Sequence, residues 1–156
     1  MSALENSPRI TPFLWFDSNA EEAIEFYLSI FKNSRRLSEL RNPGEAPGPK
    51  GSILTIAFEL DGQKFTALNG GPHHKFTDAI SFVVRCETQQ EVDYYWEKLT
   101  DGGSEVACGW LRDKFGLSWQ IVPTPMLEMI KNPKAMRAMM GMKKIDLAEL
   151  ERATKE

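Results

Sequence analysis

The order of secondary-structure elements that the sequence predicts occurs twice, and this repetition constrains the fold most. Residues 10–16 (ITPFLWF) form an apolar, aromatic-rich segment that predicts a strand. The apolar periodicity of residues 20–31 predicts a helix, and a weak strand is expected over 35–41. Residues 52–68 predict a hairpin, because Asp61-Gly62 is a pair favoured in two-residue turns. The first half therefore predicts a strand, a helix and three further strands.

The second half repeats this order. Residues 79–86 (AISFVVRC) predict a strand, and residues 88–100 predict an amphipathic helix. Short strands are expected around 105–111 and 117–122, joined by a turn at Asp113–Gly116. A shift of 69 residues brings similar residue types together. It places Phe13 on Phe82, Leu14 on Val83, Phe26 on Tyr95, Tyr27 on Trp96 and Ile30 on Leu99. We interpret this pattern as an internal duplication.

Two connections in the first half carry signals of their own. The triplet Asp17-Ser18-Asn19 precedes the predicted helix and offers oxygens that could cap its N-terminus. Residues 41–51 contain three prolines and three glycines. This composition predicts a mobile loop.

The duplication predicts the fold class. Two βαβββ modules, about 9–71 and about 78–123, are expected to form one α+β domain with a curved, cup-shaped sheet of eight strands and a helix outside each half. A chain of 156 residues is long enough for one sizeable core. Residues 124–156 predict a helical tail, which Asn132-Pro133 interrupts and whose last helix Asp146 can cap.

The composition is that of an ordinary globular protein, with 42% hydrophobic and 26% charged residues. A net charge of −3 gives no electrostatic footprint for nucleic acid or an anionic membrane. Two cysteines cannot form a disulfide framework or a four-thiolate zinc site. No segment has the pattern of a signal peptide or the length of a membrane span. We therefore expect a cytoplasmic protein with reduced thiols.

Several segments resemble the PhnB-like family of the vicinal oxygen chelate (glyoxalase/bleomycin-resistance) superfamily, from about Ile10 to the C-terminus. They are TPFLWFDSNAEEAIEFY, FELDGQKFTALNGGP, AISFVV, CGWLRDKFGLSWQIVP and MMGMKKIDLAELERA. The strings LNGGP and FGLSWQIVP are fairly specific to the family, which often carries the label 3-demethylubiquinone-9 3-methyltransferase. The resemblance implies a fold and leaves the reaction open, because function depends on the site.

The resemblance also implies where a divalent metal would bind. Enzymes of this superfamily hold it inside the cup, through His or Glu on the first and last strands of each half. The matching windows here are 10–13, 67–69, 79–81 and 119–121, and none contains His, Asp, Glu or Cys. The expected occupants are Thr11, Asn69, a residue near Ile80, and Gln120. Only Gln120 is even a marginal ligand, so we expect no metal and no other cofactor.

Two other groups could carry chemistry. His73 and His74 are neighbours whose side chains would point to opposite sides of an extended chain, so we interpret them as turn residues. His73 could still form hydrogen bonds at the rim of the cup. Cys108 could be a nucleophile, but no partner base is identifiable, and a small buried apolar residue is the favoured interpretation.

The methyltransferase label is not supported by the predicted order of elements. Adenosylmethionine enzymes of the common type use a doubly wound sheet with a glycine-rich first turn. The glycine pairs at 70–71 and 102–103 lack the strand–GxGxxG–helix context of a nucleotide site. We interpret the label as a family name.

An aromatic-lined pocket remains as the strongest functional prediction. If Thr11 faces the cup, strand alternation places Phe13 and Trp15 there as well. If Gln120 faces the cup, Trp119 packs against a helix. The predicted ligand-binding residues are Thr11, Phe13, Trp15, Asn69, Ser81, Trp110 and Gln120.

We therefore predict a metal-free protein that holds a small, partly aromatic organic molecule. A filled interior without ligand is one alternative. Another is a superfamily enzyme, such as a lyase, a dioxygenase or the methyltransferase of the label, with unrecognised metal or cysteine chemistry.

The tail carries six of the seven methionines. Met136, Met139 and Met140 have the i, i+3, i+4 spacing of one helix face. Similar pairs, Leu127 with Ile130 and Leu147 with Leu150, occur beside it. Large apolar patches are seldom left open in a monomer, so we predict a two-fold homodimer to which the tail contributes. The alternative is a tail that folds back over its own chain.

Overall fold

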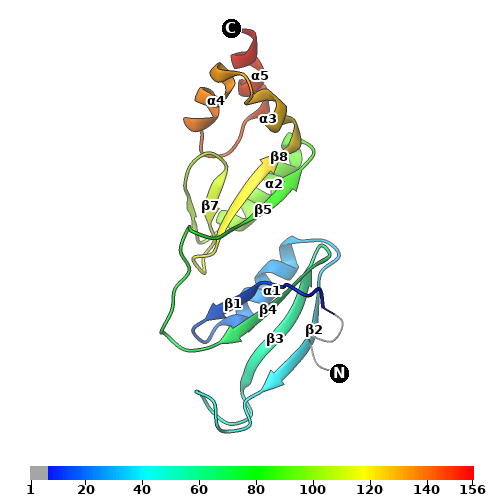
Figure 1. Cartoon of the computed structure of the whole chain (residues 1–156), viewed down its shortest axis with the longest axis vertical. Helices are drawn as coiled ribbons and strands as arrows, with labels where there is room; N and C mark the ends of the chain where they lie inside the picture. Colours follow the sequence, from blue (N-terminus) through cyan, green and yellow to red (C-terminus); the bar gives the residue numbers. More distant parts are fainter. Residues whose placement is uncertain (1–6) are drawn as a thin grey trace. The chain divides into compact units, whose positions relative to one another are not determined.

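The computed structural model describes residues 7–156 and divides into two compact units, the first ending at Lys75 and the second beginning at Phe76 (Figure 1). Each unit contains one βαβββ module, and the division falls in the connection predicted between residues 71 and 78. The α+β class, the paired modules and the helical tail are confirmed. The eight strands form two four-stranded sheets. A single cup-shaped sheet and a single domain stay predictions.

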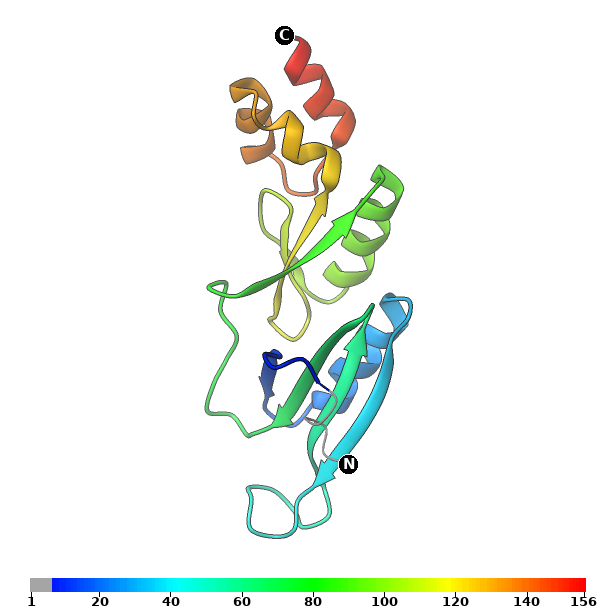
Figure 2. The same ribbon diagram turned by 45° about the vertical axis from the view of Figure 1, so that its right-hand side comes forward.

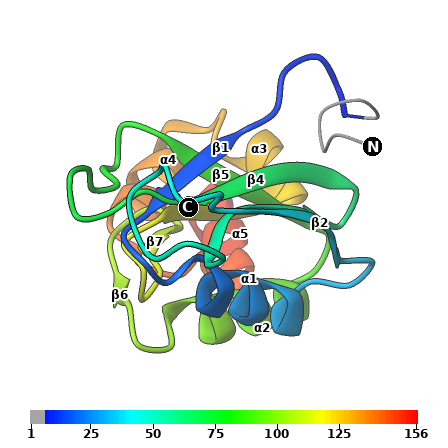
Figure 3. The ribbon, with the colours of Figure 1, turned by 90° about the horizontal axis from the view of Figure 1, so that it is seen from below.

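The first module forms a sheet with the strand order β1-β4-β3-β2. Its elements are β1 Phe13–Phe16, α1 Ala20–Ile30, β2 Arg35–Arg41, β3 Ile53–Leu60 and β4 Gln63–Asn69. β1 runs parallel to β4, and the other neighbours are antiparallel. Helix α1 lies along one side of this sheet (Figure 3).

Helix α1 divides the first sheet into a covered face and an open face. Leu14 and Phe16 are buried, whereas Phe13 is 59% exposed and Trp15 is half-buried. Because successive side chains of a strand point to opposite faces, Phe13 and Trp15 share the helix-free face. This is the alternation that the sequence predicted for them.

The predicted hairpin between β3 and β4 is confirmed. Asp61 and Gly62 both have positive φ, 46° and 88°. Two such residues in succession are required by the type I′ turn, whose twist matches that of the flanking strands. The turn fixes the pairing of Leu60 with Gln63, and with it the register of the whole hairpin.

The cap of α1 comes from a distant residue and corrects the sequence prediction. Asn19 occupies the N-cap position but makes no side-chain capping hydrogen bond. The Oδ1 atom of Asn69, at the end of β4, instead accepts from the backbone N–H of Ala20 at 2.9 Å. The Asn69 Nδ2 group donates to the carbonyl of Ile53 at 3.1 Å. Tertiary pairing of β1 with β4 brings this amide to the helix, which the local sequence could not indicate.

The loop between β2 and β3 is organised by one buried side chain. Asn42 is 2% exposed, and its amide makes five hydrogen bonds to the backbone of residues 44–48. Its own backbone pairs with Ser52 and Gly51. The prediction of a mobile loop from its glycines and prolines therefore overlooked the asparagine that gives the loop a defined conformation.

The second module has the same strand order, β5-β8-β7-β6. Its elements are β5 Ser81–Cys86, α2 Gln89–Thr100, β6 Ser104–Glu105, β7 Trp110–Arg112 and β8 Ser118–Pro123. Trp119 and Ile121 are buried, whereas Gln120 between them is half-buried. The predicted packing of Trp119 on the helix side is therefore confirmed.

The correspondence at a shift of 69 residues holds for two buried pairs in the helices but is offset by one residue in the strands. The pairs Tyr27/Trp96 and Ile30/Leu99, 69 residues apart, are buried in both modules. In the strands, Phe13 lies on the helix-free face of its sheet, whereas Phe82 lies beside Trp119 on the helix side. The same shift therefore reverses strand faces, because side chains alternate with a period of two residues.

The turn between β7 and β8 is held by Asp113, which is 3% exposed. Its Oδ1 atom accepts from the backbone N–H groups of Phe115 and Leu117, at 2.8 and 3.1 Å. Its Oδ2 atom accepts from the indole N–H of Trp119 at 2.9 Å. The turn predicted at Asp113–Gly116 is confirmed, and the Asp113 side chain caps its backbone.

The tail forms three helices, α3 Thr124–Met129, α4 Pro133–Met140 and α5 Leu147–Lys155 (Figure 2). Asn132 and Asp146 cap α4 and α5, and the Asp146 cap agrees with the prediction. The helices share a small core of their own, formed by Met126, Ala135, Met142, Ile145 and Leu150.

The tail is attached to the second module by polar contacts. The backbone N–H groups of Cys108 and Gly109 donate to the carbonyls of Met142 and Lys143, each at 2.8 Å. The amide of Gln89, at the start of α2, binds the Ile145 carbonyl and the N–H of Leu147, each at 2.9 Å. The tail thus packs on its own chain. No helix within residues 7–156 is long and apolar enough to cross a membrane.

We predict that Asn42→Ala lowers the free energy of unfolding by about 2–4 kcal/mol, because buried backbone groups lose their partners. Glu45→Ala, an exposed change in the same loop, should alter it by less than about 0.5 kcal/mol. Urea unfolding measures both. Equal effects of the two changes would show that Asn42 does not organise the loop.

Candidate functional site

The helix-free face of the second sheet gathers three of the predicted ligand-binding residues. Gln120 in β8 lies between Val83 in β5 and Trp110 in β7, and register places these three residues in one row. The Nε2 group of Gln120 donates to Oγ of Ser81 at 2.9 Å. Ser81, Trp110 and Gln120 therefore form one cluster of neutral polar and aromatic groups.

A charged pair lies beside this cluster, and the sequence prediction missed it. The Asp78 carboxylate accepts from Nε of Arg112 at 2.8 Å, from its second guanidinium nitrogen, and from the Ser118 hydroxyl at 2.6 Å. These hydrogen bonds hold the pKa of Asp78 well below its usual range, and those from Arg112 have the largest effect. Only the strand register could have indicated this pair. Ser118 in β8 is paired with both Ser81 and Arg112, and Asp78 precedes Ser81 by three residues, so the register brings Asp78 close to Arg112.

The helix-free face of the first sheet carries Phe13 and Trp15, with Thr11 two residues before the strand. Phe13 is the most exposed of the three, and Thr11 is half-buried. In the sheet, Phe13 is paired with Thr66 of β4, and Trp15 is paired with Leu68. These three predicted residues thus lie on the first unit, separate in the chain from the cluster on the second.

The string LNGGP builds a platform around Trp15. A Cβ on Gly70 would lie 2.4 Å from the indole ring, so the ring occupies the space where any side chain would be. The indole N–H donates to the carbonyl of Gly71 at 2.9 Å, and Gly71 itself has φ +91°. His74 meets the ring edge-on, with centroids 4.6 Å apart. The two glycines and His74 therefore serve to fix Trp15.

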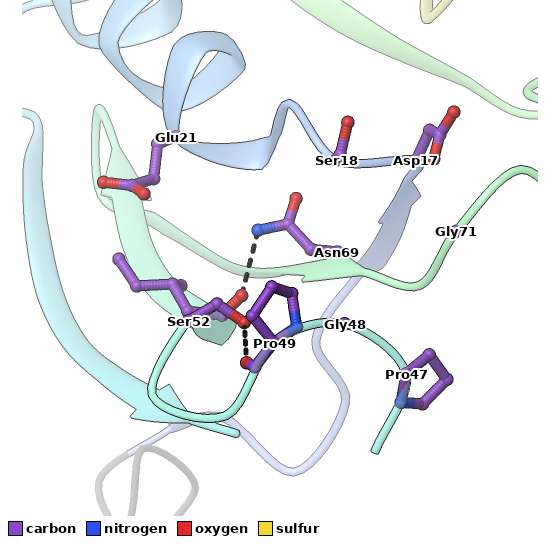
Figure 4. Close-up of a pocket in the computed structure, with 10 residues that line it drawn as sticks. Asp17, Ser18, Glu21, Pro47, Gly48, Pro49, Ser52, Asn69 and Gly71 are labelled. Atoms are coloured by element: carbon purple, nitrogen blue, oxygen red, sulfur yellow. Dashed lines mark hydrogen bonds between the residues drawn. The ribbon is translucent and has the colours of Figure 1, made fainter. Parts of the chain in front are cut away.

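Asn69 does not share the face of Trp15. It pairs with Phe16 and holds the start of α1, on the helix side of the sheet. There it lines a separate hollow of about 350 Å³ (Figure 4). The other lining residues are Asp17, Ser18, Glu21, Pro47, Gly48, Pro49, Ser52, Ile53 and Gly71. The sequence prediction placed Asn69 in the cup, on the helix-free face of its strand, whereas its side chain lies on the helix side with Phe16.

The residues do not form a recognisable metal site. Within residues 7–156, no three side chains of His, Cys, Asp or Glu come together in a way that could hold a metal ion. His73 and His74 are exposed, and His74 packs on Trp15. At two of the windows where the sequence resemblance would place a metal, Gln120 donates to Ser81 and Asn69 binds the backbone. This donor set does not fit a divalent cation.

The two cysteines differ in environment. Cys86 is fully buried, and this burial, together with the nearby Glu91 and Glu87 carboxylates, raises its pKa to about 11. Cys108 is half-buried, and its Sγ atom lies 3.7 Å from the Met140 carbonyl oxygen. A thiol with a high pKa is a poor nucleophile, and a peptide carbonyl is no base. The surroundings of Cys86 and of Cys108 therefore do not favour a reactive thiolate.

We predict that Gly70→Ala destabilises the fold by about 1–3 kcal/mol, because the new methyl group overlaps the Trp15 indole. In a Trp15→Leu background, the same change should cost much less. A double-mutant cycle by urea unfolding tests this. An equal cost of Gly70→Ala in both backgrounds would contradict the contact.

The family of the chain follows from comparison with known proteins. Residues 8–122 match the family model described as 3-demethylubiquinone-9 3-methyltransferase. The match ends within β8, so the tail, which the sequence resemblance had included, lies outside it. No curated protein matches the chain.

Solved structures agree with this match. A putative 3-demethylubiquinone-9 3-methyltransferase (PhnB protein) from Bacillus cereus is 37% identical, with a TM-score of 0.67, covering 74% of this chain and 99% of that one. A Pseudomonas aeruginosa protein is 21% identical, with a TM-score of 0.60, covering 74% and 96%.

More distantly, the fosfomycin resistance protein FosX from Listeria monocytogenes, in a complex with Mn(II) and sulfate, is 15% identical with a TM-score of 0.51, covering 75% and 90%. That likeness shows the fold alone. The family match over residues 8–122 and the 37% identity to the Bacillus cereus protein show that the chain belongs to the PhnB-like, or 3-demethylubiquinone-9 3-methyltransferase, family.

Proposed function

We propose that this protein binds, in the cytoplasm and without a metal, a small and partly aromatic organic molecule. The observation that carries the proposal is the cluster of Ser81, Trp110 and Gln120 on the helix-free face of the second sheet. Small-molecule sites are mostly apolar and aromatic, with a few placed polar groups, and this cluster has that character. Thr11, Phe13 and Trp15 on the first sheet stay predicted ligand contacts.

The competing function is an enzyme of the same superfamily, such as a lyase, a dioxygenase or the methyltransferase of the family label. Three observations favour binding. The donor set at the inherited metal windows does not fit a cation, and neither thiol has an activating partner in the contacts described above. Each sheet is mixed, with one parallel and two antiparallel pairings, and lacks the doubly wound architecture of the common adenosylmethionine enzymes.

We predict that protein purified without tags or chelators carries an organic ligand and substoichiometric metal. Native mass spectrometry should show a co-purified small molecule that Trp110→Ala removes, while Tyr94→Ala, an exposed change on α2, retains it. Elemental analysis of the same sample provides the second measurement. Near-stoichiometric Ni, Zn, Fe or Mn would favour the enzyme instead.

We also propose a homodimer to which the tail contributes. The tail core buries part of the methionine stripe, since Met139 packs against it. Met140 and Leu127 remain 65% and 53% exposed, and Met136 is partly exposed. Flexible, polarizable methionine side chains suit contact with a second surface.

The dimer is best tested by point changes. Truncation after Pro123 would remove Ile145, which packs on Gly109 of the second module. The shortened chain could then unfold as well as dissociate, and the two effects could not be told apart. We predict that Met136→Lys/Met140→Lys gives a folded monomer, whereas Lys134→Ala/Lys143→Ala, exposed changes beside them, leaves a dimer. Light scattering at tens of micromolar measures both. A monomeric wild-type protein would contradict the proposal.

A further inference from the structure

The four tryptophans differ in the partners of their indole N–H groups. Trp15 donates to the Gly71 carbonyl at 2.9 Å, Trp96 to the Glu105 carboxylate at 2.6 Å, and Trp119 to Asp113 at 2.9 Å. Trp110 has neither an acceptor nor a stacking partner within residues 7–156. Buried or half-buried indole N–H groups ordinarily find an acceptor, so this one is available to a bound molecule.

Gln120, directly opposite Trp110 in the sheet, also keeps one polar atom available. Its Nε2 group donates to Ser81, whereas no donor to its Oε1 atom is found in the described part of the chain. Residues paired across strands have Cβ atoms about 4.5–5.5 Å apart. One small molecule can therefore reach both side chains.

The charge on this face is compensated. Arg112, two residues from Trp110 along β7 and on the same face, is bound by Asp78 through two of its nitrogens. Val83, on the other side of Gln120, is apolar and exposed. Arg85, two residues beyond Val83 on the same face, is paired with Glu87 at 3.2 Å. Both cations of β5 and β7 thus have a carboxylate partner, and the surroundings of the two available groups favour an uncharged ligand over an ionised one.

We propose that this face selects an uncharged, planar aromatic molecule in which a hydrogen-bond acceptor and a donor are adjacent, as in a lactam or an ortho-hydroxy carbonyl compound. The acceptor takes the Trp110 N–H, the donor binds Oε1 of Gln120, and the ring packs on Val83 and the indole. The inference rests on the proposed function of the same cluster and names the chemical class of its ligand.

Three bicyclic probes of similar shape test this class. 2-Quinolone has adjacent C=O and N–H groups, coumarin keeps the C=O but has a ring oxygen in place of the N–H, and naphthalene has neither. Equilibrium dialysis should give affinities in the order 2-quinolone, coumarin, naphthalene, with about a five- to tenfold step for each hydrogen bond. The anion 2-naphthoate should bind more weakly than 2-quinolone.

Two variants assign the hydrogen bonds to residues. Trp110→Phe keeps an aromatic ring but removes the N–H, so it should weaken 2-quinolone and coumarin about five- to tenfold and leave naphthalene unchanged. Gln120→Met keeps the length of the side chain and should weaken 2-quinolone alone. Tyr94→Phe is the matched control. Circular dichroism checks that each variant is folded.

The outcomes separate this inference from the proposed function. Equal affinities for the three probes, or an unchanged affinity for 2-quinolone in Trp110→Phe, would overturn the inference. If no probe binds while native mass spectrometry shows a charged or non-aromatic co-purified ligand, the inference is wrong and the proposed function stands. If no probe binds and no ligand co-purifies, both fail.

Discussion

The alternation of side chains across each sheet is the constraint on which the rest of the structure depends. In both modules a single helix covers one face, and the residues beneath it, such as Phe16 and Trp119, are buried. Every second residue is thereby directed to the helix-free face, where Trp15 and Gln120 lie. A one-residue slip of register would exchange core and candidate site, so packing of the core and exposure of the site are fixed together.

Buried polar side chains fix the backbone around these faces. Asn42 organises the long loop of the first module, Asp113 the turn of the second, and Asn69 the start of α1. Each satisfies several backbone groups that would otherwise be costly to bury. Asp113 also takes the indole N–H of Trp119, which links the turn to the core beneath the candidate site.

The sequence predicted what depends on local pattern, and it missed what depends on tertiary pairing. The periodicity of apolar residues was sufficient to predict the order of elements, and the Asp61-Gly62 pair was sufficient to predict the hairpin. The pairing of β1 with β4, which brings Asn69 to α1 and Gly70 under Trp15, joins segments about 50 residues apart. The Asp78–Arg112 pair likewise depends on a register that a short strand such as β7 does not reveal. A single shift of 69 residues matches buried positions in the two helices, but in the strands it pairs residues that lie on opposite faces of their sheets.

The exchange of indole hydrogens with solvent tests most directly whether the helix-free face of the second sheet is open to a ligand. An amide and indole ¹⁵N–¹H spectrum should resolve four indole N–H signals. We expect the Trp110 signal to exchange fastest, because Trp15, Trp96 and Trp119 donate to protein acceptors. Added 2-quinolone should shift and protect the Trp110 signal. A Trp110 signal as protected as that of Trp119 in the free protein would show that its N–H already has a partner and that this face is closed.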